Sequence, residues 1–272
     1  MEVPEPVALW WGQEADSPVV AVAVHAGRAL RPEIGEQSAL TITDRLHEED
    51  LGTAEWATRF PTHVVAGRSR FEVDLNRPRE DAVYLDPEEC WDLEVWREPP
   101  PPDMVARSRA AHDVFYSVLA DILDRTQAAL GPFVVYDLHS YNHRRGGPDA
   151  PPADPAGHPD VNVGTGSMNR KRWGSLVDRF IADLGSAKVP YGDSDRLDVR
   201  ENVCFKGRQL ARWVHERYPE TGCALALEVK KFYMDEHTGE IDAELHEGVG
   251  DALASTVPGI LEELGRHRRS AG

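Results

Sequence analysis

Three apolar runs of this sequence each end at a residue that could bind a metal or move a proton. His25 and His139 each follow a run rich in valine, and Glu228 follows a shorter run of alanine and leucine. Such runs are typical of buried strands, and in α/β sheets ligands and catalytic groups gather at the carboxyl ends of the strands. Two histidines and a glutamate at three such ends predict a metal site with a catalytic carboxylate beside it.

A third metal ligand is expected among the acids that follow the first strand. Catalytic zinc usually takes three protein ligands from His, Asp and Glu and keeps a fourth position for water. The cluster Glu48, Glu49 and Asp50 lies at or near the start of the next helix, above the same sheet edge as His25. An acidic run at a helix start also complements the helix dipole without any metal. Composition alone therefore leaves the choice among the three acids open.

A further group of polar residues occupies the segment 68–78. As a strand, this segment would place Arg70, Glu72, Asp74 and Asn76 on one face. The guanidinium fork of an arginine matches a carboxylate in a bidentate arrangement, so arginines beside a metal site predict a carboxylate-bearing substrate. The alternative interpretation is internal salt bridges with the local aspartates and glutamates.

The elements that must position these residues alternate between strand and helix, which predicts a mostly parallel sheet covered by helices. The expected strands are 18–24, 62–66, 71–75, 133–138 and 223–229; the expected helices are 47–59, 103–130, 170–184, 206–217 and a last one that starts near Asp242 and is kinked or divided at Pro258. Two irregular segments remain. Residues 87–102 form an excursion, and residues 143–158 form a loop that is either a wall or lid of the site or an ordinary surface loop.

Length and composition restrict the class of protein. The chain has 272 residues, enough for one large α/β domain, and we find no repeat and no convincing boundary, so we expect a single domain over 1–272. A formal net charge of −17 argues against a nucleic-acid-binding surface. No apolar run approaches the roughly 20 residues that span a membrane, and the acidic start does not read as a signal peptide. Three scattered cysteines make neither a disulfide framework nor a cysteine zinc site. The expected location is the cytoplasm.

Five motifs carry a family resemblance. They are HAG at 25–27, DLGT at 50–53, SRFEVDLNRP at 69–78, DLHS at 137–140 and LEVKKFYMDE at 227–236. From about residue 18 to residue 240 the chain resembles the N-formylglutamate amidohydrolase family, relatives of the zinc carboxypeptidases and aspartoacylases. The resemblance implies a phosphorylase/hydrolase-like three-layer α/β/α sandwich with a mostly parallel mixed sheet, and one Zn²⁺.

The resemblance also implies roles for individual residues. His25, Asp50 and His139 would hold the metal, and Glu228 would be the general base. Arg70 would polarise the scissile carbonyl, while Asn76 and Arg77 would bind the substrate carboxylate. Carboxypeptidases have a glutamate three residues after the first histidine, where this chain has Arg28, so the acidic ligand must come from elsewhere. Asp50 is the expected ligand and Glu49 the alternative.

Together with these residues, the resemblance implies a zinc-dependent amidohydrolase that cleaves a small N-acyl amino acid similar to N-formylglutamate. Amide hydrolysis near neutral pH needs an activated water, a proton-transferring carboxylate and a cation opposite the metal. A carboxypeptidase-like hydrolase of a peptide or peptidoglycan fragment is an alternative. A non-catalytic relative that kept the fold is another. The sequence predicts a small carboxylate-bearing substrate and does not indicate an oligomeric state.

Overall fold

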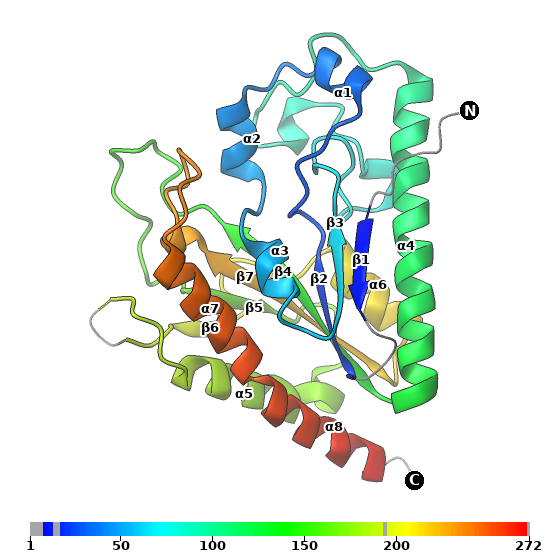
Figure 1. Ribbon diagram of the computed structural model, residues 1–272, viewed down its shortest axis with the longest axis vertical. Coiled ribbons are helices and arrows are strands. Elements are labelled where there is room, and N and C mark those ends of the chain that lie inside the picture. Colours follow the sequence, from blue (N-terminus) through cyan, green and yellow to red (C-terminus); the bar gives the residue numbers. More distant parts are fainter. Residues whose placement is uncertain (1–7, 13–16, 193–194, 271–272) are drawn as a thin grey trace.

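The computed structural model describes residues 8–12, 17–192 and 195–270, which form one seven-stranded mixed sheet (Figure 1). The strand order is β1-β3-β2-β4-β7-β5-β6, and all neighbours are parallel except the pairs β1–β3 and β5–β7. The strands are β1 (Ala8–Gly12), β2 (Val19–Ala23), β3 (Thr62–Ala66), β4 (Phe133–Tyr141), β5 (Val161–Gly164), β6 (Val199–Glu201) and β7 (Gly222–Lys230).

Helices cover both faces of this sheet. They are α1 (Pro32–Gln37), α2 (Ile42–Glu48), α3 (Thr53–Ala57), α4 (Pro102–Leu130), α5 (Arg170–Ser186), α6 (Gln209–Arg217), α7 (Ala243–Ser255) and α8 (Val257–Ser270). Three 3₁₀ turns add η1 (Arg79–Asp81), η2 (Pro87–Glu89) and η3 (Lys231–Tyr233).

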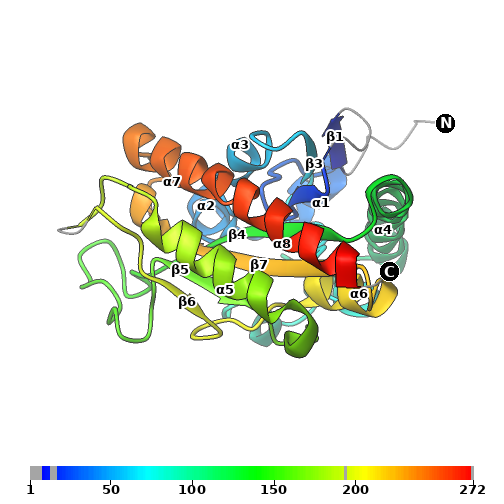
Figure 2. The ribbon, with the colours of Figure 1, turned by 90° about the horizontal axis from the view of Figure 1, so that it is seen from below.

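Alternating side chains of the strands build two separate cores. Val19, Ala21 and Ala23 of β2 pack with apolar residues of α3, α5, α7 and α8. Val20 and Val22 point to the opposite face and pack with α4 and α6. Figure 2 shows these two helix layers on either side of the sheet. The predicted three-layer α/β/α arrangement with a mostly parallel mixed sheet is confirmed.

Most of the predicted elements exist within a few residues of their expected bounds. The helix predicted at 103–130 is α4, which begins at Pro102 after a run of prolines and ends before Gly131, a residue with a positive φ of 76°. The predicted last helix begins after Asp242, whose side chain caps it, and is divided at Thr256, just before Pro258. Proline lacks the amide hydrogen that would continue α7.

Two predicted elements are wrong. The helix expected over 47–59 is two short helices, α2 and α3, because the chain is extended at Glu49 and left-handed at Gly52. The strand expected over 71–75 is a series of turns. Side chains there supply the hydrogen bonds that a strand partner would otherwise supply: Asp74 accepts from the amide of Asn76 at 2.8 Å.

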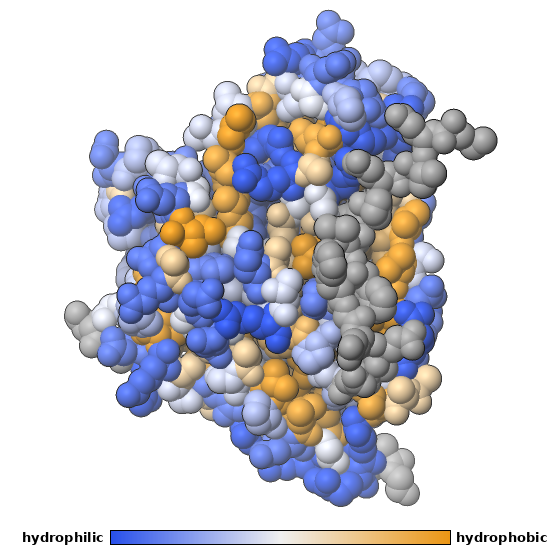
Figure 3. Space-filling view, viewed as in Figure 1, coloured by the Kyte–Doolittle hydropathy of each residue, from blue (hydrophilic) through white to orange (hydrophobic). Residues whose placement is uncertain are grey.

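A third apolar cluster lies apart from the sheet and supports the segment between β3 and α4. It joins Ile34 of α1 to Phe71, Tyr84 and Trp96. Figure 1 shows α1, α2 and this segment grouped at one end of the molecule. On the face drawn in Figure 3, hydrophilic side chains predominate, with smaller apolar groups between them. Among the described residues, none of the helices combines the length and apolar character needed to cross a membrane.

Candidate metal centre and active site

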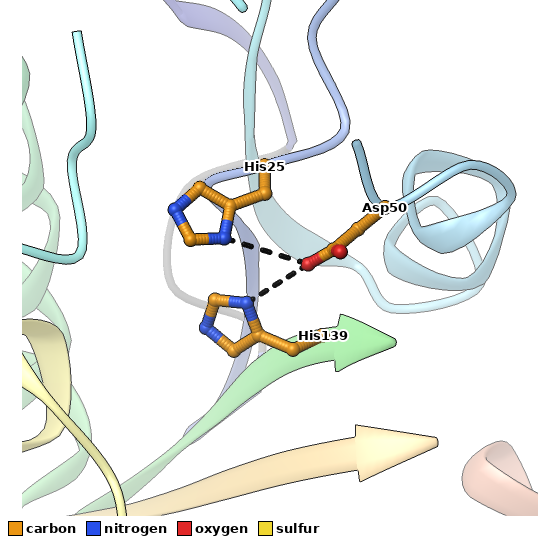
Figure 4. Close-up of side chains that lie close together, drawn as sticks. All are labelled: His25, Asp50 and His139. Carbon is orange, nitrogen blue, oxygen red and sulfur yellow. Dashed lines mark hydrogen bonds and ion pairs between the residues drawn. The ribbon is translucent and has the colours of Figure 1, made fainter. Parts of the chain in front are cut away.

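His25, Asp50 and His139 meet beyond the carboxyl ends of two adjacent strands (Figure 4). His25 follows β2, and His139 lies near the end of β4, the parallel neighbour of β2. The Oδ2 atom of Asp50 lies 3.5 Å from Nδ1 of His25 and 3.0 Å from Nδ1 of His139. All three residues are buried. The structure thus brings together the three residues for which the sequence predicts metal binding.

Asp50 is held in place by the connection between α2 and α3. Its amide donates to the carbonyl of His25 at 3.1 Å, and its own carbonyl accepts from Oγ1 of Thr53 at 2.7 Å. Gly52 then turns the chain with a φ of 87°, and a Cβ atom there would lie 2.6 Å from Nε2 of His246. A side chain at position 52 would clash with His246, so this turn requires glycine. The turn separates α2 from α3, and the hydrogen bonds of Asp50 hold its carboxylate in the gap between them.

The neighbouring acids have other partners. Glu49 is fully buried, with one oxygen 2.6 Å from Oγ of Ser69 and 2.9 Å from Nη2 of Arg45. Glu48 accepts two hydrogen bonds from Arg145, at 2.8 and 3.1 Å. Of the three acids that the sequence left open, only Asp50 lies between the two histidines.

The outer nitrogen of each histidine faces a second carboxylate. Nε2 of His25 lies 2.7 Å from Oδ1 of Asp74, and Nε2 of His139 lies 2.8 Å from Oδ1 of Asp137. Burial by itself would lower the pKa of His139, but the two aspartates beside it raise that pKa well above its usual value. Burial would likewise raise the pKa of Asp50, but hydrogen bonds from the histidines lower it well below its usual range.

This arrangement fits a divalent metal. A carboxylate on Nε2 keeps the proton on that nitrogen and leaves the Nδ1 lone pair for the metal, which is the usual support of metal-binding histidines. Two Nδ1 atoms and one carboxylate oxygen converge here, and two nitrogens with one oxygen are a common ligand set of catalytic zinc. The sequence analysis did not predict that Asp74 and Asp137 support the metal-binding histidines. The sequence did signal them, because each lies inside a motif that also contains a predicted site residue.

Glu228 lies beside the metal cluster. It occupies β7, where it is paired in register with His139 of β4, and it lines the same cavity. None of the described residues donates a hydrogen bond to its carboxylate. Burial raises the pKa of Glu228 to about 7, and the nearby carboxylates of Asp50 and Asp137 act in the same direction, against the two histidines. A carboxylate with such a pKa can both accept and return a proton near neutral pH.

Arg70 is buried in the wall of the cavity and held from several sides. Its Nη2 lies 3.1 Å from Oδ2 of Asp74, its Nε donates to the hydroxyl of Tyr84 at 3.2 Å, and its guanidinium lies 4.8 Å from the ring centre of Trp91. Burial would lower its pKa, but Tyr84 and Asp74 raise it well above the usual value. The site therefore contains one fixed, permanent cation.

The two predicted carboxylate-binding residues are placed differently. Asn76 lines the cavity, where its Nδ2 lies 3.1 Å from Nε2 of His139 and its Oδ1 accepts from the amide of Leu210. Arg77 is not among the residues that line the cavity. Its guanidinium lies 4.5 Å from the ring centre of Tyr84 and donates to the carbonyl of Glu89.

Four further residues of the cavity are an aromatic residue and three cations for which the sequence gave only weak signals. The irregular segment 87–102 contributes Trp91, and the loop 143–158 contributes Arg145. Arg208 lies at the start of α6, is exposed, and has no side-chain partner among the described residues. Lys231 is 1% exposed and donates to the carbonyls of residues 47 and 49. The signals were the position of Lys231, three residues after Glu228, and the expectation that the loop 143–158 could form a wall of the site.

Comparison with known protein families decides the relationship. The model of the family described as N-formylglutamate amidohydrolase matches residues 17–234. The chain belongs to this family. The match contains every residue of the metal cluster, Glu228 and the cavity, so the family assignment rests on the segment that forms the site.

Two solved structures show the same fold. An N-formylglutamate amidohydrolase from Ralstonia eutropha JMP134 superposes with a TM-score of 0.75 at 17% identity, covering 95% of this chain and 98% of the other. A gene product of Agrobacterium tumefaciens superposes with a TM-score of 0.63 at 19% identity, covering 98% and 96%. Comparison with curated protein sequences gives no match.

Proposed function

We propose that this family member is a zinc-dependent amidohydrolase that releases the acyl group of a small N-acyl amino acid, with N-formyl-L-glutamate as the model substrate. The observation that carries the proposal is the convergence of His25, Asp50 and His139 in one buried cluster, with Glu228 beside it. Family membership supports an amidohydrolase, and the ligand set supports the metal.

His25, Asp50 and His139 would hold the metal, with Asp74 and Asp137 orienting the two rings. A zinc ion bound there supplies a lowered pKa for a water molecule and polarisation of the substrate carbonyl. Glu228 is proposed to take the proton of the attacking water and to pass it to the departing amine. Burial raises the pKa of this carboxylate above its ordinary value, which suits a group that both accepts and returns a proton.

Arg70 is proposed to stabilise the charge that develops on the carbonyl oxygen. Its contacts with Asp74 and Tyr84 hold the guanidinium in place before the substrate arrives. Such pre-organised cations opposite a developing oxyanion contribute a few kcal/mol to catalysis in comparable sites. Asp74 touches both His25 and Arg70, so it would link the metal side of the site to the cationic side.

Cations around the cavity support a substrate that carries carboxylates. Asn76 and Arg77 remain our proposal for one carboxylate, with Arg77 leaving the Glu89 carbonyl when the substrate binds. We add Arg208, an exposed lining residue without a partner among the described residues, as the ligand of a second carboxylate. A glutamate-like substrate has two carboxylates to match.

The direct test is release of formate from N-formyl-L-glutamate by the zinc-loaded protein, compared with N-formyl-L-glutamine and N-formyl-L-leucine. These analogues keep the formamide and lose the side-chain carboxylate. We expect kcat/KM to be highest for the glutamate compound, because each analogue leaves the cation proposed for the side-chain carboxylate without its partner. Equal turnover of all three would contradict the proposed carboxylate recognition, and no turnover of any would contradict the substrate class.

A further inference from the structure

A second group of potential metal ligands lies outside the cavity. One ligand atom each from His47, Glu236 and His237 lies within 4.8 Å of the others. His47 belongs to the last turn of α2, whereas Glu236 and His237 lie between η3 and α7. In Figure 1 that segment, drawn in orange, runs beside the green loop after β4. The amide of His143 in this loop donates to Oε2 of Glu236 at 2.9 Å, so three segments meet here.

Each of these side chains keeps one buried atom without a partner among the described residues. The atoms are Nε2 of His47, Oε1 of Glu236 and Nε2 of His237. Glu236 is 2% exposed, so its free oxygen is a strong exception to the rule that buried polar atoms are hydrogen-bonded. Two imidazoles and a carboxylate, each with a buried atom that lacks a hydrogen-bond partner among the described residues, are a donor set that suits a divalent cation.

The remaining atoms of the same side chains fix their orientation. Nδ1 of His47 lies 3.1 Å from Oε1 of Glu48, which leaves Nε2 as the free nitrogen. The rings of His47 and His237 stack with centres 5.0 Å apart. Asp235 accepts from the amides of His237 and Thr238 and so shapes the turn that presents His237. A carboxylate on the far nitrogen, as Glu48 provides for His47, is the support expected of a metal-binding histidine.

We propose that His47, Glu236 and His237 bind a second divalent metal of the zinc class. Imidazole and carboxylate together suit Zn²⁺. Tetrahedral ligands of zinc lie about 3.3 Å apart, so the ligand atoms, which lie within 4.8 Å of one another, would move slightly closer together on binding. Nδ1 of His143, which has no hydrogen-bond partner among the described residues, lies 4.0 Å from Oε1 of Glu236, at the edge of this group. The three side chains would occupy three of the four tetrahedral positions and leave the fourth to another donor or to water.

The site would stiffen the wall of the active cavity. Glu48, next to His47, lines that cavity, as do Lys231 and Asn142. Lys231 donates to the carbonyl of His47 at 2.6 Å, and Nδ2 of Asn142 donates to the same carbonyl at 2.8 Å. A metal that joins α2 to the segment after η3 would therefore hold these lining residues in register. The proposal does not depend on the reaction at the first site.

Metal stoichiometry tests the proposal. The purified full chain is stripped with a chelator, dialysed against ZnCl₂ and analysed for zinc. We expect about two Zn²⁺ per wild-type chain and about one for the His25→Ala/His139→Ala variant. Glu236→Gln and His237→Gln should each bind about one, because glutamine keeps the size of the side chain and, at 236, still accepts from the His143 amide. His158→Ala removes a histidine outside both groups and should bind two.

Thermal melting gives an independent readout. In the His25→Ala/His139→Ala background, ZnCl₂ should raise Tm, since a ligand that binds only the folded state stabilises it, and adding Glu236→Gln should abolish the rise. One zinc per wild-type chain with unchanged content in Glu236→Gln and His237→Gln would overturn the proposal. An equal loss of zinc from His158→Ala would also overturn it, by showing adventitious surface binding. If the His25→Ala/His139→Ala variant still binds about one zinc, and that zinc is lost with Glu236→Gln, the second site is supported independently of the first.

Discussion

His139 and Glu228 are paired in register on the neighbouring parallel strands β4 and β7. This pairing places the proposed general base beside a proposed metal ligand through backbone hydrogen bonds of the central sheet, where both strands are buried along most of their length. The central sheet therefore sets the relative position of these two groups, and segments outside β4 and β7 supply the other two proposed ligands and the cations.

Glu228→Gln should preserve folding and zinc content and lower kcat by about 10²–10⁴-fold, the usual contribution of a general acid–base residue. The base acts when ionised, so activity should fall as the pH drops through the pKa of Glu228, about 7 in the absence of a metal. A bound cation favours the ionised carboxylate, so the acidic limb of the loaded enzyme should lie below 7. Steady-state kinetics across pH would detect it. Near-full activity of the variant would contradict the assigned role.

Asp50→Asn should lose zinc far more readily than Glu49→Asn, although the two residues are adjacent. Asp50 lies between the histidines, whereas Glu49 pairs with Arg45 and Ser69. Zinc retained after dialysis against a weak chelator is the measurement, in a background that carries Glu236→Gln to remove the second site. Greater loss from the Glu49 variant would move the ligand by one residue.

Arg208→Lys and Arg77→Lys should each raise KM for N-formyl-L-glutamate by about tenfold, because a lysine keeps the charge but loses the bidentate fork. Arg107→Lys is the matched control, since Arg107 is exposed on α4 and pairs with Asp103. An unchanged KM in Arg208→Lys would remove that residue from the site. An unchanged KM in Arg77→Lys would show that it stays on the Glu89 carbonyl throughout.

His215 should make the fold acid-sensitive. Its Nε2 accepts from the amide of Ala224 at 3.0 Å, and burial lowers its pKa to about 4. The unfolded chain binds a proton below about pH 6.5 while the folded chain does not, so stability is lost as the pH falls from 6.5 to 4. One pKa unit corresponds to about 1.4 kcal/mol, which makes the loss about 3 kcal/mol.

His215→Gln keeps an acceptor for the Ala224 amide and removes the titrating group. Urea unfolding at pH 7 and at pH 5 should therefore show a smaller loss of stability in the variant than in the wild type. A pH dependence equal to that of the wild type would assign the acid sensitivity to other groups.

The sequence predicted the residues that strands position and was weaker for those that loops position. His25, His139 and Glu228 each follow or end an apolar run, and period and composition are enough to locate such runs. The strand predicted over 71–75 is wrong because the alternation of apolar and polar residues there is the same as in a strand. In the structure, the side chain of Asp74 instead accepts a hydrogen bond of a turn. Arg145 and Arg208 reach the cavity from loops, and local sequence carries little information about where a loop returns to the sheet.

For Asp50 the sequence predicted the cluster of acids but did not distinguish the ligand within it. Its acidic neighbours looked equivalent in the sequence, and only the left-handed turn at Gly52 and the hydrogen bond from its amide to His25 distinguish it. The resemblance to the family selected Asp50, and the position of its carboxylate between the two histidines supports that choice.

Formate release before and after metal removal tests the central claim most directly. The full chain is assayed with N-formyl-L-glutamate, stripped with a chelator, assayed again, and then titrated with ZnCl₂ while bound zinc is measured in the same samples. We predict that activity disappears with the metal and returns as zinc refills the site formed by His25, Asp50 and His139, and that Asp50→Asn does not recover. Full activity in protein stripped of metal would contradict the account.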